Sequence, residues 1–162
     1  MGIGLSKPTL GILALGCFTL DQAIKYLVRI AMAPGDSLAI LPNVLHITYV
    51  HNTGVAFSLF RQYPQGLLLL TMLLFGVFLV LAFKPARYTL LQWLGFGFVL
   101  GGAAGNIADR ILFGKVIDYI DVAVIRYPVF NLADSFICVG VGLLLLHYWQ
   151  KGSYDNGTHS AV

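Results

Sequence analysis

The acidic residues of this sequence are all aspartates, and two of them lie where carboxylates could do chemistry. The chain has seven acidic residues and no glutamate. Asp118 lies among apolar residues in the stretch 116–121, and Asp134 begins a segment that carries no other charge. Two carboxylates in a poorly solvated site share one proton, so one acts as a base towards water and the other protonates a leaving amine. Such a pair would hydrolyse an amide bond as aspartic peptidases do, without a metal, serine or cysteine.

Both aspartates also have a structural explanation. Asn131 fits a helix N-cap, and Asp134 would then lie in the first turn, where the helix dipole favours negative charge. A long loop separates Asp118 from Asp134, so only the fold can bring the two together. Asp121 is a third acid nearby. We expect it to be a solvated surface residue, and it is the first substitute to test if the pair is misassigned.

Ionisable residues also interrupt the first apolar segment. Asp21, Lys25 and Arg29 follow one another at four-residue spacing, which places them on one face of a helix. A charge at membrane depth costs about 2.5–3.5 kcal/mol, so such residues usually have a partner or a function. The spacing favours an ion-paired seam that orients the helix, and a stripe that faces the substrate is the alternative.

A second polar group ends the third apolar segment. Asn106, Asp109 and Arg110 are three or four residues apart, so all three project from one side of the helix end. Asp109 and Arg110 could form an ion pair at the membrane surface that stiffens this end of the helix. A role in a functional site is the alternative, and the sequence favours neither.

These residues must be positioned by a membrane protein. Hydrophobic residues make up 58% of the 162 residues and charged residues only 10%, which excludes an ordinary soluble domain, a disordered chain and a nucleic-acid-binding arm. A helix needs about 20 apolar residues to cross the hydrocarbon core. Gly97, Gly101 and Gly105 form a ridge of small residues that permits close helix packing. The sequence predicts four membrane-spanning helices, at about residues 9–33, 63–83, 88–108 and 131–150.

The predicted fold is an all-α membrane protein, four transmembrane helices with a small extracytoplasmic β-containing cradle. The larger loops, 34–62 and 109–130, lie on the side opposite both termini. Residues 45–49 alternate between apolar and polar, which predicts a strand and a short sheet at the membrane surface. We expect one domain over residues 1–150 and a disordered tail over residues 151–162. The basic residues are distributed too evenly to decide which side is cytoplasmic.

Five short motifs occur along the chain in a set order. They are Asp21-Gln22-x-x-Lys25, His51-Asn52-Thr53-Gly54-Val55-Ala56-Phe57, Gly105-Asn106-Ile107-Ala108-Asp109-Arg110, Val116-Ile117-Asp118-Tyr119 and Phe130-Asn131-Leu132-Ala133-Asp134-Ser135. Together they resemble the bacterial lipoprotein signal peptidases, or signal peptidase II. Any one motif is weak evidence, whereas five in the order of that family, covering residues 21 to 135, are highly specific.

The resemblance implies an intramembrane aspartic endopeptidase that removes the signal peptide from diacylglyceryl-modified prolipoproteins. The cut would fall just before the lipidated cysteine. Asp118 and Asp134 match the catalytic pair, and neither a cofactor nor a metal is implied. The residues that match positions for substrate binding or site support are Asn52, Gly54, Asn106, Arg110, Asn131, Ala133, Asp109, Asp21 and Lys25.

The same resemblance implies a location and a set of partners. The protein would be a multi-pass protein of the bacterial inner membrane, with both termini in the cytoplasm and the active site near the outer face. Its partners would be the diacylglyceryl-prolipoprotein substrate, membrane lipid and inhibitors such as the cyclic peptide globomycin. We expect a monomer that binds no nucleic acid.

Two other functions fit the residues alone. In a small transporter or channel, the polar groups would line an ion path, although four spans without an internal repeat make this the weaker interpretation. In a non-catalytic membrane subunit, the same groups would hold helices together. The sequence contains neither a GxSxG nor an HExxH motif, which are typical of other peptidases.

Overall fold

Four long helices form the body of the molecule. The computed structural model describes residues 5–54, 64–84, 87–125 and 127–159. Each helix is long and apolar enough to cross a membrane, so the predicted architecture of four such helices is confirmed. The start predicted for the second helix, residue 63, lies outside the described residues. The helices are α1 (Lys7–Ala31), α2 (Pro64–Phe83), α3 (Leu90–Phe113) and α4 (Leu132–His159).

Helix α4 is longer than its apolar segment. The apolar run ends near residue 150, but the helix continues to His159. No proline interrupts residues 132–159, so the backbone hydrogen bonds can continue past the membrane-spanning part. The segment 151–162, expected to be disordered, is thus helical as far as His159, and residues 160–162 lie outside the described part.

The ends of α3 are defined by the sequence. Thr89 and Gln92 form a capping box, in which the Thr89 hydroxyl accepts from the Gln92 backbone N–H at 3.3 Å and the Gln92 side chain accepts from the Thr89 N–H at 3.2 Å. Gly114 ends the helix in the left-handed conformation, with a φ of 69°. The chain therefore turns sharply after α3 and leads directly into a strand.

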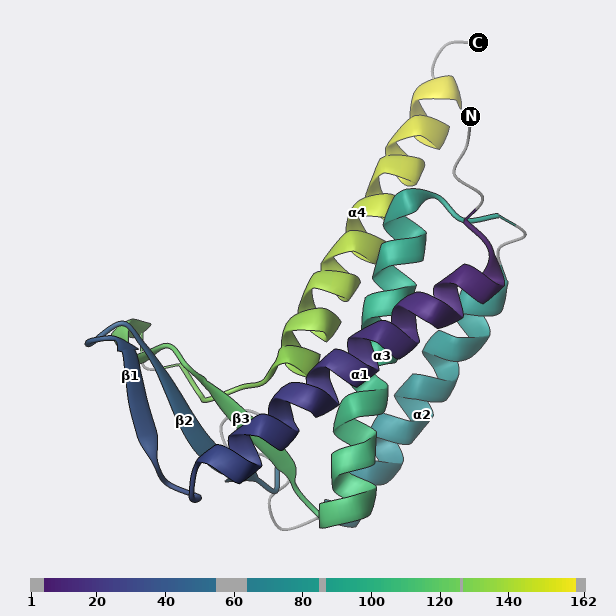
Figure 1. Ribbon diagram of the computed structural model, residues 1–162. Coiled ribbons are helices and arrows are strands. Elements are labelled where there is room, and N and C mark those ends of the chain that lie inside the picture. Colours follow the sequence, from purple (N-terminus) through teal and green to yellow (C-terminus); the bar gives the residue numbers. More distant parts are fainter. Residues whose placement is uncertain (1–4, 55–63, 85–86, 126, 160–162) are drawn as a thin grey trace.

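Helix α3 is the centre of the bundle and packs against α1, α2 and α4 (Figure 1). Glycines on two sides of α3 let its neighbours approach closely. A Cβ at Gly101 would lie 2.6 Å from the carbonyl oxygen of Ala14 in α1, and one at Gly102 would lie 2.5 Å from that of Ala133 in α4. The predicted glycine ridge, to which Gly101 belongs, faces α1. Close packing thus brings polar residues of α1 and α4 within hydrogen-bonding range of α3.

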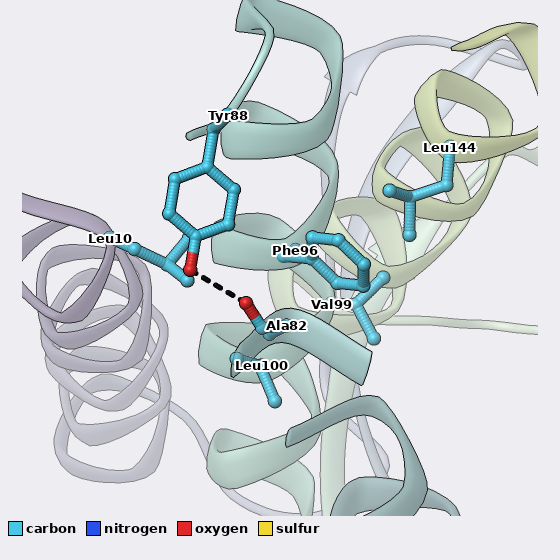
Figure 2. Close-up of a cluster of buried hydrophobic side chains, with 7 residues drawn as sticks. All are labelled: Leu10, Ala82, Tyr88, Phe96, Val99, Leu100 and Leu144. Carbon is cyan, nitrogen blue, oxygen red and sulfur yellow. Dashed lines mark hydrogen bonds between the residues drawn. The ribbon is translucent and has the colours of Figure 1, made fainter. Parts of the chain in front are cut away.

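An apolar cluster joins the four helices and the segment that connects α2 to α3 (Figure 2). The Tyr88 hydroxyl donates to the carbonyl oxygen of Ala82 at 2.6 Å, which satisfies one of the acceptors left free at the end of α2. Burial of these side chains stabilises the bundle at the end away from the polar residues. The cluster consists of Leu10, Ala82, Tyr88, Phe96, Val99, Leu100 and Leu144.

A three-stranded antiparallel sheet lies at the end of the bundle opposite the termini (Figure 1). Its strands are β1 (Ser37–Leu41), β2 (Leu45–Asn52) and β3 (Val116–Asp121), in that order across the sheet. The strand predicted over residues 45–49 is confirmed as part of β2. The short 3-10 helix η2 (Ala123–Ile125) follows β3.

A second apolar cluster joins this sheet to the bundle. Val28 of α1 packs with Tyr49 of β2 and with Ile117 and Tyr119 of β3, and all four are buried. Ile117 and Tyr119 lie on one face of β3, since side chains alternate along a strand, and Asp118 between them points to the other face. The sheet is thereby held against the end of α1 with Asp118 in a defined direction.

Candidate active site

The chain folds back between Asp118 and Asp134 and brings the two aspartates to one cavity. Phe130 pairs with Ile120, with backbone N···O distances of 2.7 and 3.1 Å, so the segment before α4 returns along β3. Asn131 then begins α4 beside Asp118. A cavity of about 220 Å³ is lined by both aspartates. The fold thus supplies the proximity that the sequence could not.

Asp118 is almost completely buried, at 1% exposure, and is held by two amides. Asn52 donates to its Oδ2 and Asn131 to its Oδ1, both at 2.7 Å. Burial and, to a smaller extent, the nearby Asp134 raise the pKa of Asp118 to about 6, although the two amides lower it. A carboxyl group in this position keeps its proton to a much higher pH than an exposed aspartate does.

Asp134 fits both explanations that the sequence offered. Its backbone N–H donates to Asn131 Oδ1 at 2.9 Å, and its Oδ2 accepts from the Asn131 N–H at 3.3 Å. This reciprocal pair caps α4, as expected. Its other oxygen, Oδ1, accepts from Asn106 Nδ2 at 2.7 Å, and the side chain also lines the cavity. The helix cap therefore holds one side of the carboxylate while the other side is available to the site.

The orientation of each asparagine amide is determined by a group that can only donate. Gly54 N–H donates to Asn52 Oδ1 at 2.9 Å, and Asp134 N–H donates to Asn131 Oδ1. Lys25 Nζ donates to Asn106 Oδ1 at 3.0 Å. Since each oxygen is held in this way, each NH₂ group must face the carboxylates. Three neutral donors therefore hold the two carboxylates without adding charge.

A buried ion cluster lies behind these amides. Lys25, at 2% exposure, is 2.9 Å from both Asp21 Oδ2 and Asp109 Oδ2. The expected pairing of Asp21 with Lys25 is confirmed, whereas Arg29 stacks over the Phe113 ring at 4.5 Å instead of joining the seam. The pairing considered between Asp109 and its neighbour Arg110 is wrong. Asp109 instead points towards α1, where it pairs with the buried Lys25.

The remaining predicted residues also converge on this end of the bundle. Arg110 donates to the backbone oxygen of Asn106 at 3.2 Å and to that of Gly54 at 3.4 Å. Ala133 is fully buried, and its backbone N–H donates to Asp21 Oδ1 at 3.0 Å. All of the residues proposed from the sequence thus belong to one connected network. Residues 55–57 of the second motif lie outside the described residues.

Asp121 does not belong to this network. It lies three residues after Asp118 on β3, so its side chain points to the opposite face of the sheet. There its Oδ2 accepts from the Thr48 hydroxyl at 2.8 Å. It is half-buried rather than fully solvated, which corrects our expectation. Its position on the other face leaves it without access to the cavity.

Sequence reasoning missed two supporting residues. Gln22 donates to Asp109 Oδ1 at 3.0 Å and to Asp21 Oδ2 at 3.3 Å, and its place directly after Asp21 was the available signal. The Tyr119 hydroxyl accepts from the Leu132 N–H at 3.2 Å in the first turn of α4, and no sequence signal indicated this. In the described part of the chain, no group of three His, Cys, Asp or Glu side chains could hold a metal.

Comparison with known proteins places this site in a family. The family model for signal peptidase (SPase) II matches residues 13–150 of the chain. The chain belongs to the signal peptidase II family. Members of this family cleave signal peptides from prolipoproteins, so the chain is a multi-pass membrane protease of that class.

Individual relatives agree with this result over most of their length. The lipoprotein signal peptidase of Nostoc punctiforme is 41% identical over 140 residues, which cover 86% of this chain and 89% of that protein. That of Gloeothece citriformis is 44% identical over 128 residues, covering 78% and 80%. A solved structure of a bacterial membrane enzyme has a TM-score of 0.84 at 29% identity and covers 91% of this chain and 92% of its own.

Proposed function

We propose that Asp118 and Asp134 are the catalytic dyad of this signal peptidase II and make it an aspartic endopeptidase. The observation that carries the proposal is their common cavity, together with the NH₂ groups of Asn52, Asn131 and Asn106 that donate to the two carboxylates. The reaction would cut the signal peptide of a diacylglyceryl-modified prolipoprotein just before the lipidated cysteine. The five motifs that include these residues support this assignment.

The proposed chemistry requires one proton shared by the pair. Asp118 holds this proton, because its burial and the nearby charge of Asp134 both favour its neutral form. Asp134, which is less buried, is the base that takes a proton from the attacking water. Asp118 polarises the scissile carbonyl. The C–N bond then breaks, and the leaving amine receives a proton, which leaves the pair with one proton as before.

We infer the surroundings of the reaction from the shape of the molecule. Strand β3, which carries Asp118, lies with the sheet at the end opposite both termini (Figure 1). Together with the family resemblance, this supports cytoplasmic termini and an active site near the outer face of the inner membrane. The lipid tails of the substrate would lie between helices, where apolar side chains suffice. The same cavity would accept globomycin-type cyclic peptides, and a monomer would be sufficient because both aspartates come from one chain.

The two rival functions make different predictions. A transporter would move a solute across a vesicle membrane and would ignore lipopeptides. A non-catalytic subunit would do neither alone. The ion cluster of Lys25, Asp21 and Asp109 does not support a transporter. Each of these side chains is almost fully buried and paired, whereas groups that line an ion path face an open cavity.

Cleavage of a synthetic diacylglyceryl prolipoprotein peptide by purified protein in detergent tests the proposal. Wild type is compared with Asp118→Asn and Asp134→Asn, and Asp121→Asn is the matched control on the same sheet. We expect the wild type and the control to cut before the lipidated cysteine, and both dyad variants to lose all measurable cleavage. Equal cleavage by all four proteins would show that the dyad is wrong, and a folded wild type that never cuts would direct attention to transport.

A further inference from the structure

Lys25 is more closely connected to the dyad than a structural ion pair requires. Its ammonium group has three N–H donors, and three oxygens lie within reach. Two belong to Asp21 and Asp109, at 2.9 Å each. The third is Oδ1 of Asn106, at 3.0 Å. The third contact leads out of the ion cluster and into the active site.

Asn106 connects Lys25 to one catalytic carboxylate. Its Oδ1 accepts from Lys25 and from Asn131 Nδ2, the latter at 3.1 Å, while its Nδ2 donates to Asp134 Oδ1 at 2.7 Å. Because an ammonium group cannot accept a hydrogen bond, Lys25 prevents the amide from turning over. A turned amide would place its oxygen against Asp134, and this contact would favour a protonated carboxyl group.

We propose that Lys25 is a positioning residue for cleavage, acting through the Asn106 amide to keep Asp134 in its ionised, proton-accepting form. This inference rests on the proposed function of the dyad. Lys25 does not touch the substrate or the reacting atoms. Its role is to make the ionised form of Asp134 the one that the surrounding hydrogen bonds favour, before any substrate arrives.

Other charges also act on Asp134 and set the background for this effect. Asp118 and Arg110 line the same cavity as Asp134. The ion cluster holds two carboxylates against the one ammonium group of Lys25, and the hydrogen-bonded route from that group to Asp134 runs through the Asn106 amide. The charged groups around Asp134 in the described residues are Asp118 on β3, Arg110 and Asp109 on α3, and Lys25 and Asp21 on α1.

The test is a double-mutant cycle on lipopeptide cleavage. It uses Lys25→Met, Asn106→Ala and the double variant, with kcat and KM measured across a range of pH. Arg29→Met is the matched control, because it removes a basic residue from the same helix without touching the site. We expect Lys25→Met to lower kcat by about 10- to 100-fold, as is typical when a group that orients a reacting residue is lost, with a smaller change in KM.

Two further results are expected. The acidic limb of the pH profile should move to higher pH in Lys25→Met, because the Asn106 amide is then free to turn its oxygen towards the carboxylate. The double variant should be little slower than Asn106→Ala, since the main connection from Lys25 to Asp134 runs through that amide. The inference would be overturned if the fold-losses in kcat of the two single variants multiplied in the double variant. A lower kcat with an unchanged pH profile would also overturn it and leave Lys25 a purely structural role.

A folding failure is addressed by a companion variant. Lys25→Met leaves Asp21 and Asp109 without their cation, so Lys25→Met combined with Asp109→Asn removes one of the two charges. If this companion folds and retains the wild-type kcat and pH profile, the inference is wrong. A wild type that does not cleave would overturn the proposed function itself, whereas a cleaving wild type with Lys25→Met indistinguishable from Arg29→Met would overturn only the role of Lys25.

Discussion

The burial of Asp118 predicts an unusual pH dependence of cleavage. Its pKa of about 6, against an ordinary 3.8, results mainly from desolvation. This difference corresponds to about 3 kcal/mol of preference for the protonated form. Because the proposed reaction needs the proton on Asp118, kcat/KM should fall as the pH rises above about 6 in the free enzyme. The apparent value belongs to the coupled pair.

Removal of one hydrogen-bond donor to Asp118 should move this alkaline limb, the fall of kcat/KM above about pH 6, in a known direction. Asn52 donates to Asp118 Oδ2 at 2.7 Å and stabilises the ionised form, so Asn52→Ala favours the protonated form and raises the pKa of Asp118. A hydrogen bond to a charged group contributes about 1.5–3 kcal/mol, which corresponds to about 1–2 pH units. The alkaline limb of kcat/KM should therefore move upwards by about that amount, even though the maximal rate falls.

The assay follows cleavage of a fluorogenic diacylglyceryl peptide in detergent from about pH 4 to about pH 9 at constant ionic strength. Asn43→Gly is the matched control, because it removes an asparagine from the β1–β2 turn, where the φ of 61° is one that glycine adopts readily. Its limb should coincide with that of the wild type. A limb in Asn52→Ala that stays in place, or that moves to lower pH, would refute the assignment of the proton to Asp118.

Two further predictions concern stability. The Tm of wild type should rise relative to that of Asp118→Asn as the pH falls from neutral to about 4. Wild type takes up a proton on folding in that range, which adds up to about 3 kcal/mol to its free energy of unfolding. A difference independent of pH would contradict the raised pKa. Gly102→Ala should lower stability by about 1–3 kcal/mol and also lower kcat, since its Cβ would press on the first turn of α4 that carries Asp134. Gly142→Ala, whose Cβ would meet nothing within 4 Å, is its control, and equal Tm values for the two variants would contradict this account.

Local sequence patterns were sufficient for the helices and for contacts within one of them. Four apolar segments predicted α1 to α4, because a membrane span requires length and composition more than specific contacts. The four-residue spacing of Asp21 and Lys25 predicted their ion pair, and the spacing of Asn131 and Asp134 predicted the cap of α4. In each case the partners are about one helical turn apart, where backbone geometry alone determines which side chains are in contact.

The sheet and the dyad depended on contacts that no local pattern contains. Residues 45–49 predicted one strand, but β1 and β3 carry no comparable alternation. Asp118 and Asp134 meet because Phe130 pairs with Ile120 and turns the chain back along β3. Such a pairing is made by backbone groups, which are the same for every residue, so the side chains around it gave no signal.

The pairing of Asp109 with Arg110 was wrong, and the reason shows which residues determine contacts between helices. Neighbours in sequence seemed natural partners, yet Asp109 pairs with Lys25 because α1 lies directly against α3 at this level. The register of that contact is set by small residues. A side chain at Gly105 would occupy the space of the Asp21 carboxylate, so only glycine there lets the ion cluster form. The glycine ridge, which the sequence explains as a packing surface, therefore also determines which charges of α1 reach the active site.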